Sequence, residues 1–208
     1  MPDVLVFAAL VPKLFGAKVI LDLHDPMPEL MMTIFNLRRE SLTVRLMAHL
    51  EKWSIAFADV AITANHTFER LFVSRSCPAS KIRVVMNSPD EQIFKYVPAQ
   101  HRNRQSDKIH RPFVIMYHGT LVERNGVDLA VEALVKLRQS VPEAELRIYG
   151  HRTPYLDQIM LTVPEKGLEK AVYYLGPRPL EQLTDAIAEC DVGVIPNKRS
   201  IFTEINTP

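Results

Sequence analysis

Glycines and basic residues come together where predicted strands give way to predicted helices in the second half of the sequence. The stretch YHGTLVERNGVDL places Gly119 and Gly126 on either side of Thr120, Arg124 and Asn125. Glycine lets the backbone approach a ligand closely, and a guanidinium group pairs well with phosphate. The stretch is therefore a candidate cradle for an anion, with an ordinary surface loop as the alternative.

The same kind of junction follows each predicted strand of this half. The carboxyl ends of parallel strands meet at one edge of a sheet, where ligands bind. A cation beside a helix N-terminus is unfavourable by a few tenths to ~1 kcal/mol, because the helix dipole is positive there. A diphosphate bound between the cation and the helix would make both interactions favourable. We therefore expect an anion site where Arg124, Arg152, Arg178 and Arg199 share a hollow, and solvated surface charge is the alternative. The junctions are His118-Gly119-Thr120, Gly150-His151-Arg152, Gly176-Pro177-Arg178 and Pro196-Asn197-Lys198-Arg199.

A second candidate group, His24 with Asp25, ends a predicted strand in the first half. Histidine could hydrogen-bond a substrate hydroxyl or transfer a proton, although such a pair more often ties down a loop. Glu29 and Glu40 are expected to be solvated, and His118 to be structural or exposed rather than catalytic.

Several function classes lack support in the sequence. The net charge is +1, so no global field attracts nucleic acid, and an anion site must be local. The two cysteines, Cys77 and Cys190, have no metal-ligand spacing and are interpreted as ordinary thiols, which favours a reducing compartment. No GxGxxG, GxxxxGK[ST] or GxSxG pattern is present. We therefore expect neither a metal cofactor nor a nucleic-acid partner.

Alternating strands and helices must position these groups. The first half predicts a buried helix over 4–14, strands over 18–23, 59–63 and 81–86, and helices over 41–57 and 66–73, the last capped by Asn65. In the helix over 41–57, the apolar stripe is expected to face inward, with Arg45 and Glu51 outward. That stripe consists of Leu42, Leu46, Leu50, Trp53 and Phe57.

The second half is more regular. Strands are predicted over 113–117, 146–149, 172–175 and 192–195, and helices over 127–140, 154–166 and 180–189. Short strand–helix–strand units favour an α/β fold with a parallel sheet covered by helices on both faces. The polar stretch 95–112 between the halves is typical of a linker.

Taken together, several stretches resemble the retaining glycosyltransferases of family 4, whose type B fold has two Rossmann-like domains. The resemblance implies an acceptor-side domain over 1–97, a linker over 98–111 and the first half of a nucleotide-sugar-binding domain over 112–208. Both domains would be incomplete, so the sequence looks like an interior piece of an enzyme. The stretches are KVILDLHDPMPEL, VVMNSPDEQIF, MYHGTLVERNGVDLAVEAL, ELRIYG, YYLGPRPLEQL and CDVGVIPNKRSIFTEINTP.

The resemblance implies transfer of a hexosyl group from a nucleotide-diphosphate sugar to a glycan or lipid-linked acceptor, with retention of configuration. Such a protein would build cell-envelope polysaccharide in the cytoplasm, with loose attachment to a membrane, and would need no metal. Three alternatives stay open: a non-catalytic nucleotide-sugar-binding module, a sugar-nucleotide epimerase of similar fold, and an interaction protein that uses unpaired sheet edges.

The resemblance also implies residue roles. The turn from Gly119 to Gly126 would lie against the donor diphosphate, and the turn from Gly176 to Pro179 would approach the nucleobase. The family commonly has Arg and Lys where Thr120 and Asn125 stand, and Arg124 is expected to replace the Lys. His24 would face the transferred sugar, near the acidic Glu204, as catalytic residues. The donor-binding set comprises Gly119, Thr120, Leu121, Arg124, Asn125, Gly150, Arg152, Gly176, Pro177, Arg178, Asn197 and Lys198.

Overall fold

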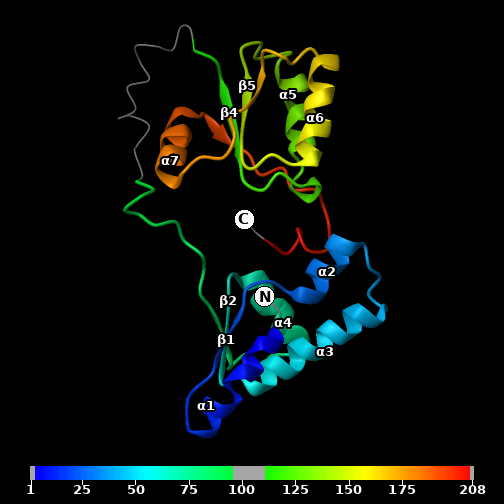
Figure 1. The fold of residues 1–208 in the computed structure, drawn as a ribbon, viewed down its shortest axis with the longest axis vertical. Coiled ribbons are helices and arrows are strands. Elements are labelled where there is room, and N and C mark those ends of the chain that lie inside the picture. Colours follow the sequence, from blue (N-terminus) through cyan, green and yellow to red (C-terminus); the bar gives the residue numbers. More distant parts are fainter. Residues whose placement is uncertain (1–2, 96–110, 207–208) are drawn as a thin grey trace. The chain divides into compact units, whose positions relative to one another are not determined.

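The computed structural model describes residues 3–95 and 111–206, which form two compact α/β units (Figure 1). The first unit comprises Met1–Ser88 with Arg199–Pro208, and the second comprises Pro89–Lys198. The predicted linker over 98–111 lies, except for Arg111, outside the described residues. The second unit ends ten residues before the predicted domain end at 208, because Phe202 is buried in the core of the first unit.

The first unit is built on a parallel sheet of three strands. Its order is β1 (Ile20–Leu23), β2 (Val60–Thr63) and β3 (Ile82–Val84). Burial alternates along β1, so that Leu21 and Leu23 enter the core while Ile20 and Asp22 are exposed. This alternation places one face of β1 against the core and leaves the other accessible.

Two capped helices cover the core of this unit. Ser41 precedes α3 (Leu42–Phe57), and its hydroxyl accepts a hydrogen bond from Val44 N. Asn65 precedes α4 (His66–Arg75), and its Oδ1 accepts from Phe68 N at 2.7 Å, which confirms the predicted cap. Ile55 of α3 and Phe68 of α4 are buried in one apolar cluster with β1 and β2.

The prediction of a buried helix over 4–14 was wrong. The segment forms a 3₁₀ helix, η1 (Asp3–Ala9), and the short helix α1 (Leu10–Leu14), and neither contains a buried residue. Its Phe7 ring packs against the Phe57 ring of α3 with centroids 5.2 Å apart, and its half-buried Val6 and Ala9 pack against the core of the first unit. The apolar side chains of α1, which are Leu10, Val11 and Leu14, face outward, and Leu14 is 77% exposed.

The orientation predicted for α3 was also wrong. Leu42 is 82% exposed and Trp53 is 56% exposed, whereas Glu51 is 1% exposed. Glu51 is buried because Arg75 of α4 supplies a charged partner inside the unit. Of the predicted apolar stripe, Leu42, Leu46 and Trp53 therefore lie on the outer face of the helix, while Leu50 and Phe57 are half-buried. Arg45 is exposed, as predicted.

A helix that the sequence analysis did not predict, α2 (Met27–Phe35), follows β1. Pro26 is its N-cap residue and Pro28 lies in its first turn, where proline is tolerated. The helix carries Glu29, which is 6% exposed, so the prediction that Glu29 is solvated was wrong.

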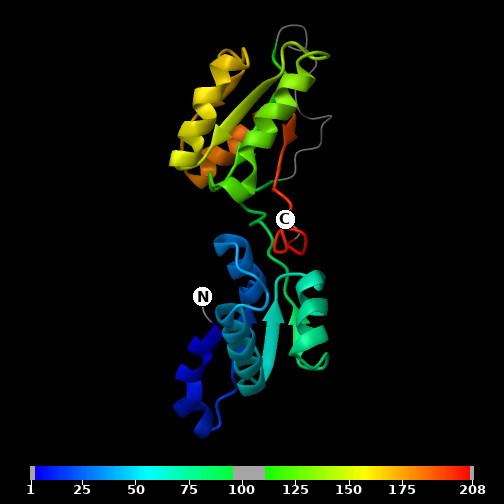
Figure 2. The same cartoon turned by 90° about the vertical axis from the view of Figure 1, so that its right-hand side faces the viewer.

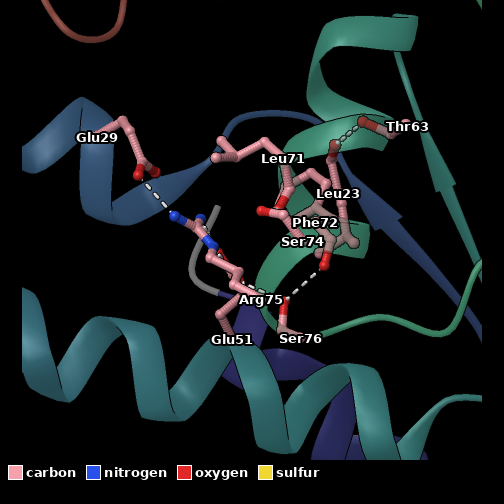
Figure 3. A network of polar contacts seen from close by, with 9 residues as sticks. All are labelled: Leu23, Glu29, Glu51, Thr63, Leu71, Phe72, Ser74, Arg75 and Ser76. Carbon is pink, nitrogen blue, oxygen red and sulfur yellow. Dashed lines mark hydrogen bonds and ion pairs between the residues drawn. The ribbon is translucent and has the colours of Figure 1, made fainter.

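Arg75 joins the two buried carboxylates (Figure 3). Its Nη1 lies 2.5 Å from Glu29 Oε1, and its Nε lies 2.9 Å from Glu51 Oε1. Ser76 Oγ donates to Glu51 Oε1 at 2.7 Å. One guanidinium thus links α2, α3 and α4, which fixes these helices around the end of α4.

The second unit contains a parallel sheet of four strands. The order is β6 (Val172–Tyr174), β5 (Glu145–Tyr149), β4 (Val114–His118) and β7 (Val192–Gly193). The helices between them are α5 (Val127–Leu137), α6 (Pro154–Glu165) and α7 (Leu180–Glu189), with a 3₁₀ turn, η3 (Glu123–Asn125), before α5. Each predicted strand and helix is present. The elements β6, β7, α5 and α6 end earlier than predicted, α7 has the predicted bounds, β4 is shifted by one residue and β5 begins one residue earlier.

Helices cover both faces of this sheet, as predicted. Tyr117 and Ile148 belong to the core formed with α5 and α6, which run side by side on one face (Figure 1 and Figure 2). Met116 and Tyr149 pack instead in a cluster with Ile187 of α7. Neighbouring residues of β4 therefore enter opposite cores, so the strand ends are held from both sides.

Candidate functional site

A cleft of about 320 Å³ opens at the carboxyl ends of β4 and β5, beside the start of α7. This is the edge where ligands of open parallel sheets bind, and the volume lies within the range of small-molecule sites. The cleft is lined by His118, Gly119, Thr120, Leu121, Tyr149, Gly150, His151, Thr153, Pro177, Arg178 and Leu183.

Two glycines bring the backbone of neighbouring junctions together in the cleft. A Cβ atom on Gly150 would lie 2.2 Å from the carbonyl oxygen of Gly119, and its φ of +150° also disfavours a side chain. Gly119 N donates to Tyr149 O at 3.1 Å, and Gly150 N donates to Gly176 O at 3.2 Å. Backbone rather than side chains therefore forms this part of the cleft wall, so a ligand can approach closely.

The loop after β4 is held from inside. The carbonyl oxygen of Thr120 accepts from Tyr117 Oη at 2.9 Å and from Asn125 Nδ2 at 2.7 Å. Burial raises the pKa of Tyr117, which keeps the hydroxyl protonated and able to donate. Within residues 3–95 and 111–206, no hydrogen bond of the Thr120 N–H group is found, so this donor is available to a ligand.

Gly126 ends this loop and begins α5. Its φ is +67°, and a Cβ atom here would lie 2.0 Å from the carbonyl oxygen of Pro196. The fourth predicted junction, which contains Pro196, therefore packs against the end of the loop. Only glycine fits both the backbone angle and the contact.

The predicted basic residues have different settings. Arg178 lines the cleft, whereas Arg124 is exposed on η3 and Arg152 pairs with Asp157 at 2.7 Å, both outside the cleft lining. Arg199 belongs to the first unit. The expected hollow lined by four arginines is therefore not found in the second unit. Of these four residues, Arg178 alone lines the cleft.

Lys198 supports the start of α5 instead of lining the cleft. Its Nζ lies 2.9 Å from Asp128 Oδ2 and 3.4 Å from Glu123 Oε1. Although burial opposes the shift, hydrogen bonds from Tyr155 and Lys198 lower the pKa of Asp128. Asn197 precedes Lys198 and does not line the cleft either.

Five lining residues were missing from the predicted donor set: His118, Tyr149, His151, Thr153 and Leu183. His118 and His151 belong to the strand-end junctions, so the rule that selected their glycines could have selected them too. Thr153 caps α6 by accepting from Leu156 N and donates to Leu121 O at 2.6 Å. A Thr-Pro pair at a helix start is a visible sequence signal for that cap.

The two predicted catalytic residues belong to the first unit. His24 follows β1 and lines a hollow of about 410 Å³ with Asp3, Asp22, Asp25 and Met27. Glu204 lies in the C-terminal segment, where its Oε1 pairs with Arg199 at 3.1 Å.

A search of residues 3–95 and 111–206 for metal-ligand groups of His, Cys, Asp and Glu found none. Over the same residues, no helix has both the length and the apolar character to cross a bilayer.

The fold places the chain in a class. The chain has two α/β units, each built on a sheet of parallel strands, and the second has a cleft at its strand ends. These features correspond to the glycosyltransferase type B fold. The chain is similar to the Anabaena protein Alr3699/HepE, solved with UDP, with a TM-score of 0.69 and 20% identity, over 94% of this chain and 51% of that one. It is also similar to sucrose-phosphate synthase from Thermosynechococcus elongatus, with a TM-score of 0.67 and 18% identity, over 94% and 48% of the two chains.

The chain belongs to the glycosyl transferases group 1 family, whose family model matches residues 99–204. Among curated relatives, the amylovoran biosynthesis glycosyltransferase AmsK of Erwinia amylovora is 23% identical over 154 residues, 73% of this chain and 36% of that protein. A GDP-mannose-dependent phosphatidylinositol monomannoside mannosyltransferase of Mycolicibacterium smegmatis is 28% identical over 140 residues, 67% and 36% of the two proteins. The chain thus spans about a third of the length of these relatives.

Proposed function

We propose that this chain is the part of a retaining glycosyltransferase that binds a nucleotide-diphosphate sugar in the cleft of the second unit. The observation that carries the proposal is the cleft at the ends of β4 and β5, which combines the backbone of Gly119 and Gly150 with the guanidinium of Arg178. The family match covers this region, and the Anabaena protein binds UDP and UDP-glucose in its solved structures.

The proposed chemistry is transfer of a hexosyl group. The bond between the anomeric carbon and the diphosphate oxygen breaks, and a bond forms between that carbon and an acceptor hydroxyl oxygen, whose proton passes to the departing diphosphate. Negative charge develops on the diphosphate oxygen in the transition state. Donors fixed in advance toward such an oxygen can lower the barrier by several kcal/mol. Arg178 and the Thr120 N–H group are proposed donors, and Arg124 is assigned to the diphosphate from the exposed side of the same loop. The proposal assigns the charge compensation to these groups and not to a metal ion.

The other predicted roles are proposed on local support. Leu121 and Pro177 line the cleft, and the carbonyl of Gly176 holds Gly150 in place. His24 is proposed as a catalytic residue because it lines a hollow at the end of β1, and Glu204 because of its match to the family pattern. We propose a glycan or lipid-linked acceptor and a cytoplasmic reaction with loose membrane contact, as in the formation of envelope polysaccharide.

The test is calorimetric titration of the 208-residue chain with UDP-, GDP- and ADP-sugars, with and without a chelator. We expect weak binding to one of them, and an affinity about tenfold lower in Arg178→Ala, because a hydrogen bond to a charged group contributes ~1.5–3 kcal/mol. Arg124→Ala is expected to weaken binding as well. Binding that survives the chelator supports charge compensation without a metal.

Lys136→Ala is the matched control, since this exposed cation lies in the last turn of α5 and does not line the cleft. An affinity that is the same in Arg178→Ala and Lys136→Ala would remove Arg178 from the site. Absence of binding to all three donors would overturn the proposal.

A further inference from the structure

Helix α3 presents apolar side chains to the outside along a regular line. Leu42, Leu46 and Trp53 are 82%, 52% and 56% exposed and follow one another at spacings of four and seven residues. Residues at these spacings share one face of an α-helix. We call these three residues the outer stripe of α3.

The buried side of the same helix explains why the stripe faces outward. Glu51 is held inside by Arg75, and Ser54 and Ile55 are fully buried beside it. Rotating α3 to bury the outer stripe would break the pair of Glu51 with Arg75 and would carry Ser54 and Ile55 out of the core. The outward stripe is therefore fixed by the core.

Basic side chains border the outer stripe. Arg45, His49 and Lys52 are exposed and repeat at spacings of four and three, so they form a row next to the stripe. Arg38 and Arg39 lie shortly before the helix and are exposed, with Glu40 as the neighbouring exposed acid. No ion pair of Arg38, Arg39, Arg45 or Lys52 is found within residues 3–95 and 111–206, so their charges are free to meet an external anion.

Trp53 adds a feature of interfacial helices. Its ring makes an edge contact with the His49 ring at a centroid distance of 6.3 Å, while more than half of its surface is open. Tryptophan and leucine beside a row of basic side chains are typical of helices that lie in the plane of a membrane surface. The apolar side chains enter the boundary between headgroups and acyl chains, and the cations meet anionic lipid.

We propose that the outer face of α3 binds the surface of an anionic lipid bilayer. The apolar stripe matches the acyl boundary, and the basic row matches the negative lipid headgroups. The proposed function includes loose membrane contact, and the outer face of α3 would be the surface that makes this contact. It does not depend on nucleotide binding, so vesicle binding and donor titration can fail independently.

The experiment measures sedimentation of the 208-residue chain with vesicles of phosphatidylcholine, with and without phosphatidylglycerol. We expect binding to the anionic vesicles that weakens with added salt. Trp53 is the only tryptophan, and its emission should shift to shorter wavelength on binding. The Arg45→Gln/Lys52→Gln variant should bind about 25-fold less, at about fivefold for each cation near a lipid surface. The Leu42→Ser/Leu46→Ser variant should lose at least about tenfold.

The matched control changes an exposed apolar residue and an exposed cation in the second unit, Leu161→Ser with Lys136→Gln. This control should bind vesicles like the unchanged chain, and circular dichroism checks that all variants are folded. Equal loss in the control and the α3 variants, or an unshifted Trp53 emission, would overturn the proposal. Self-association of the chain that the α3 variants abolish, without any vesicle binding, would also overturn the proposal. The partner of the outer stripe would then be a second copy of this chain.

Discussion

Arg75 of α4 holds Glu51 of α3 through two hydrogen bonds, with Nε 2.9 Å from Oε1 and Nη2 2.5 Å from Oε2. The Glu51 side chain has no exposed surface, and the Arg75 side chain is 20% exposed. A bidentate pair of this kind fixes the relative rotation of the two helices as well as their separation. The pair decides which face of α3 meets the core.

Arg75→Ala should destabilise the first unit by about 3–5 kcal/mol, because it leaves the buried Glu51 and Glu29 carboxylates without a cation. Urea denaturation followed by Trp53 fluorescence reports on this unit. Arg70→Ala, on the exposed side of the same helix, is the control and should change stability by less than about 0.5 kcal/mol. A similar loss in both variants would contradict a special role for the pair.

Asp3 should make the stability of the first unit depend on pH. Burial, and then the charge of Glu51, raise the pKa of Asp3 from 3.8 to about 6. The folded unit therefore holds this proton more tightly than the unfolded chain. The resulting stabilisation is complete below 3.8 and is lost as the pH rises through about 6.

In Asp3→Asn this pH dependence should disappear. Because Asp3 is partly exposed, we expect a difference of about 1 kcal/mol between the two pH limits. Denaturation midpoints of both chains across the interval measure it. Parallel curves for the two chains would show that Asp3 titrates as it does in water.

Gly126→Ala should destabilise the second unit by about 3 kcal/mol or more, since left-handed backbone strain adds to a collision with the Pro196 carbonyl. Gly167→Ala is a close control: its φ is +66°, and no atom lies within 4 Å of the added Cβ. That variant should lose only about 1–2 kcal/mol, from the backbone angle alone. Thermal unfolding followed by circular dichroism compares the two variants. Equal losses of stability would show that the collision with the Pro196 carbonyl contributes nothing beyond the backbone strain.

Tyr117→Phe should weaken donor binding by about threefold to tenfold, because the loop after β4 loses the hydrogen bond to Thr120 O. Tyr173→Phe removes an equally long hydrogen bond, 2.9 Å to Lys170 O, away from the cleft. Calorimetric titration with the best-bound nucleotide sugar measures both variants. An unchanged affinity in Tyr117→Phe would mean that the loop keeps its shape without the hydroxyl.

The architecture of the second unit could be predicted because its signals are local. Each strand is a short apolar run that ends in glycine or proline, and each helix is amphipathic with a recognisable start. The position of the cleft followed from the parallel sheet, and so did the lining by Gly119, Gly150 and Arg178. His118 was visible in the same junctions but was judged to be structural or exposed, and His151 was given no role.

The first unit was predicted less well because its decisive contacts join distant residues. The carboxylate of Glu51 is buried only because Arg75, 24 residues later, meets it. A pattern of apolar residues along α3 contains no information on that partner, so the apolar stripe was placed inside. Likewise, Arg124 and Arg152 carry the same charge as Arg178 and follow strands in the same way. Whether their side chains reach the cleft depends on the geometry of each loop, which the spacing of residues does not encode.

The first unit is discontinuous along the chain, since its final segment begins at Arg199, after the whole of the second unit. Phe202 of that segment packs near Phe68, with ring centroids 6.3 Å apart, and belongs to the core of the first unit. During synthesis on the ribosome, residues 89–198 of the second unit therefore emerge before Phe202 can join the core of the first unit. Expressing residues 1–88 alone would yield a unit without the Phe202 ring, so that Phe68, which is 1% exposed in the chain, would lose one of the side chains that cover it.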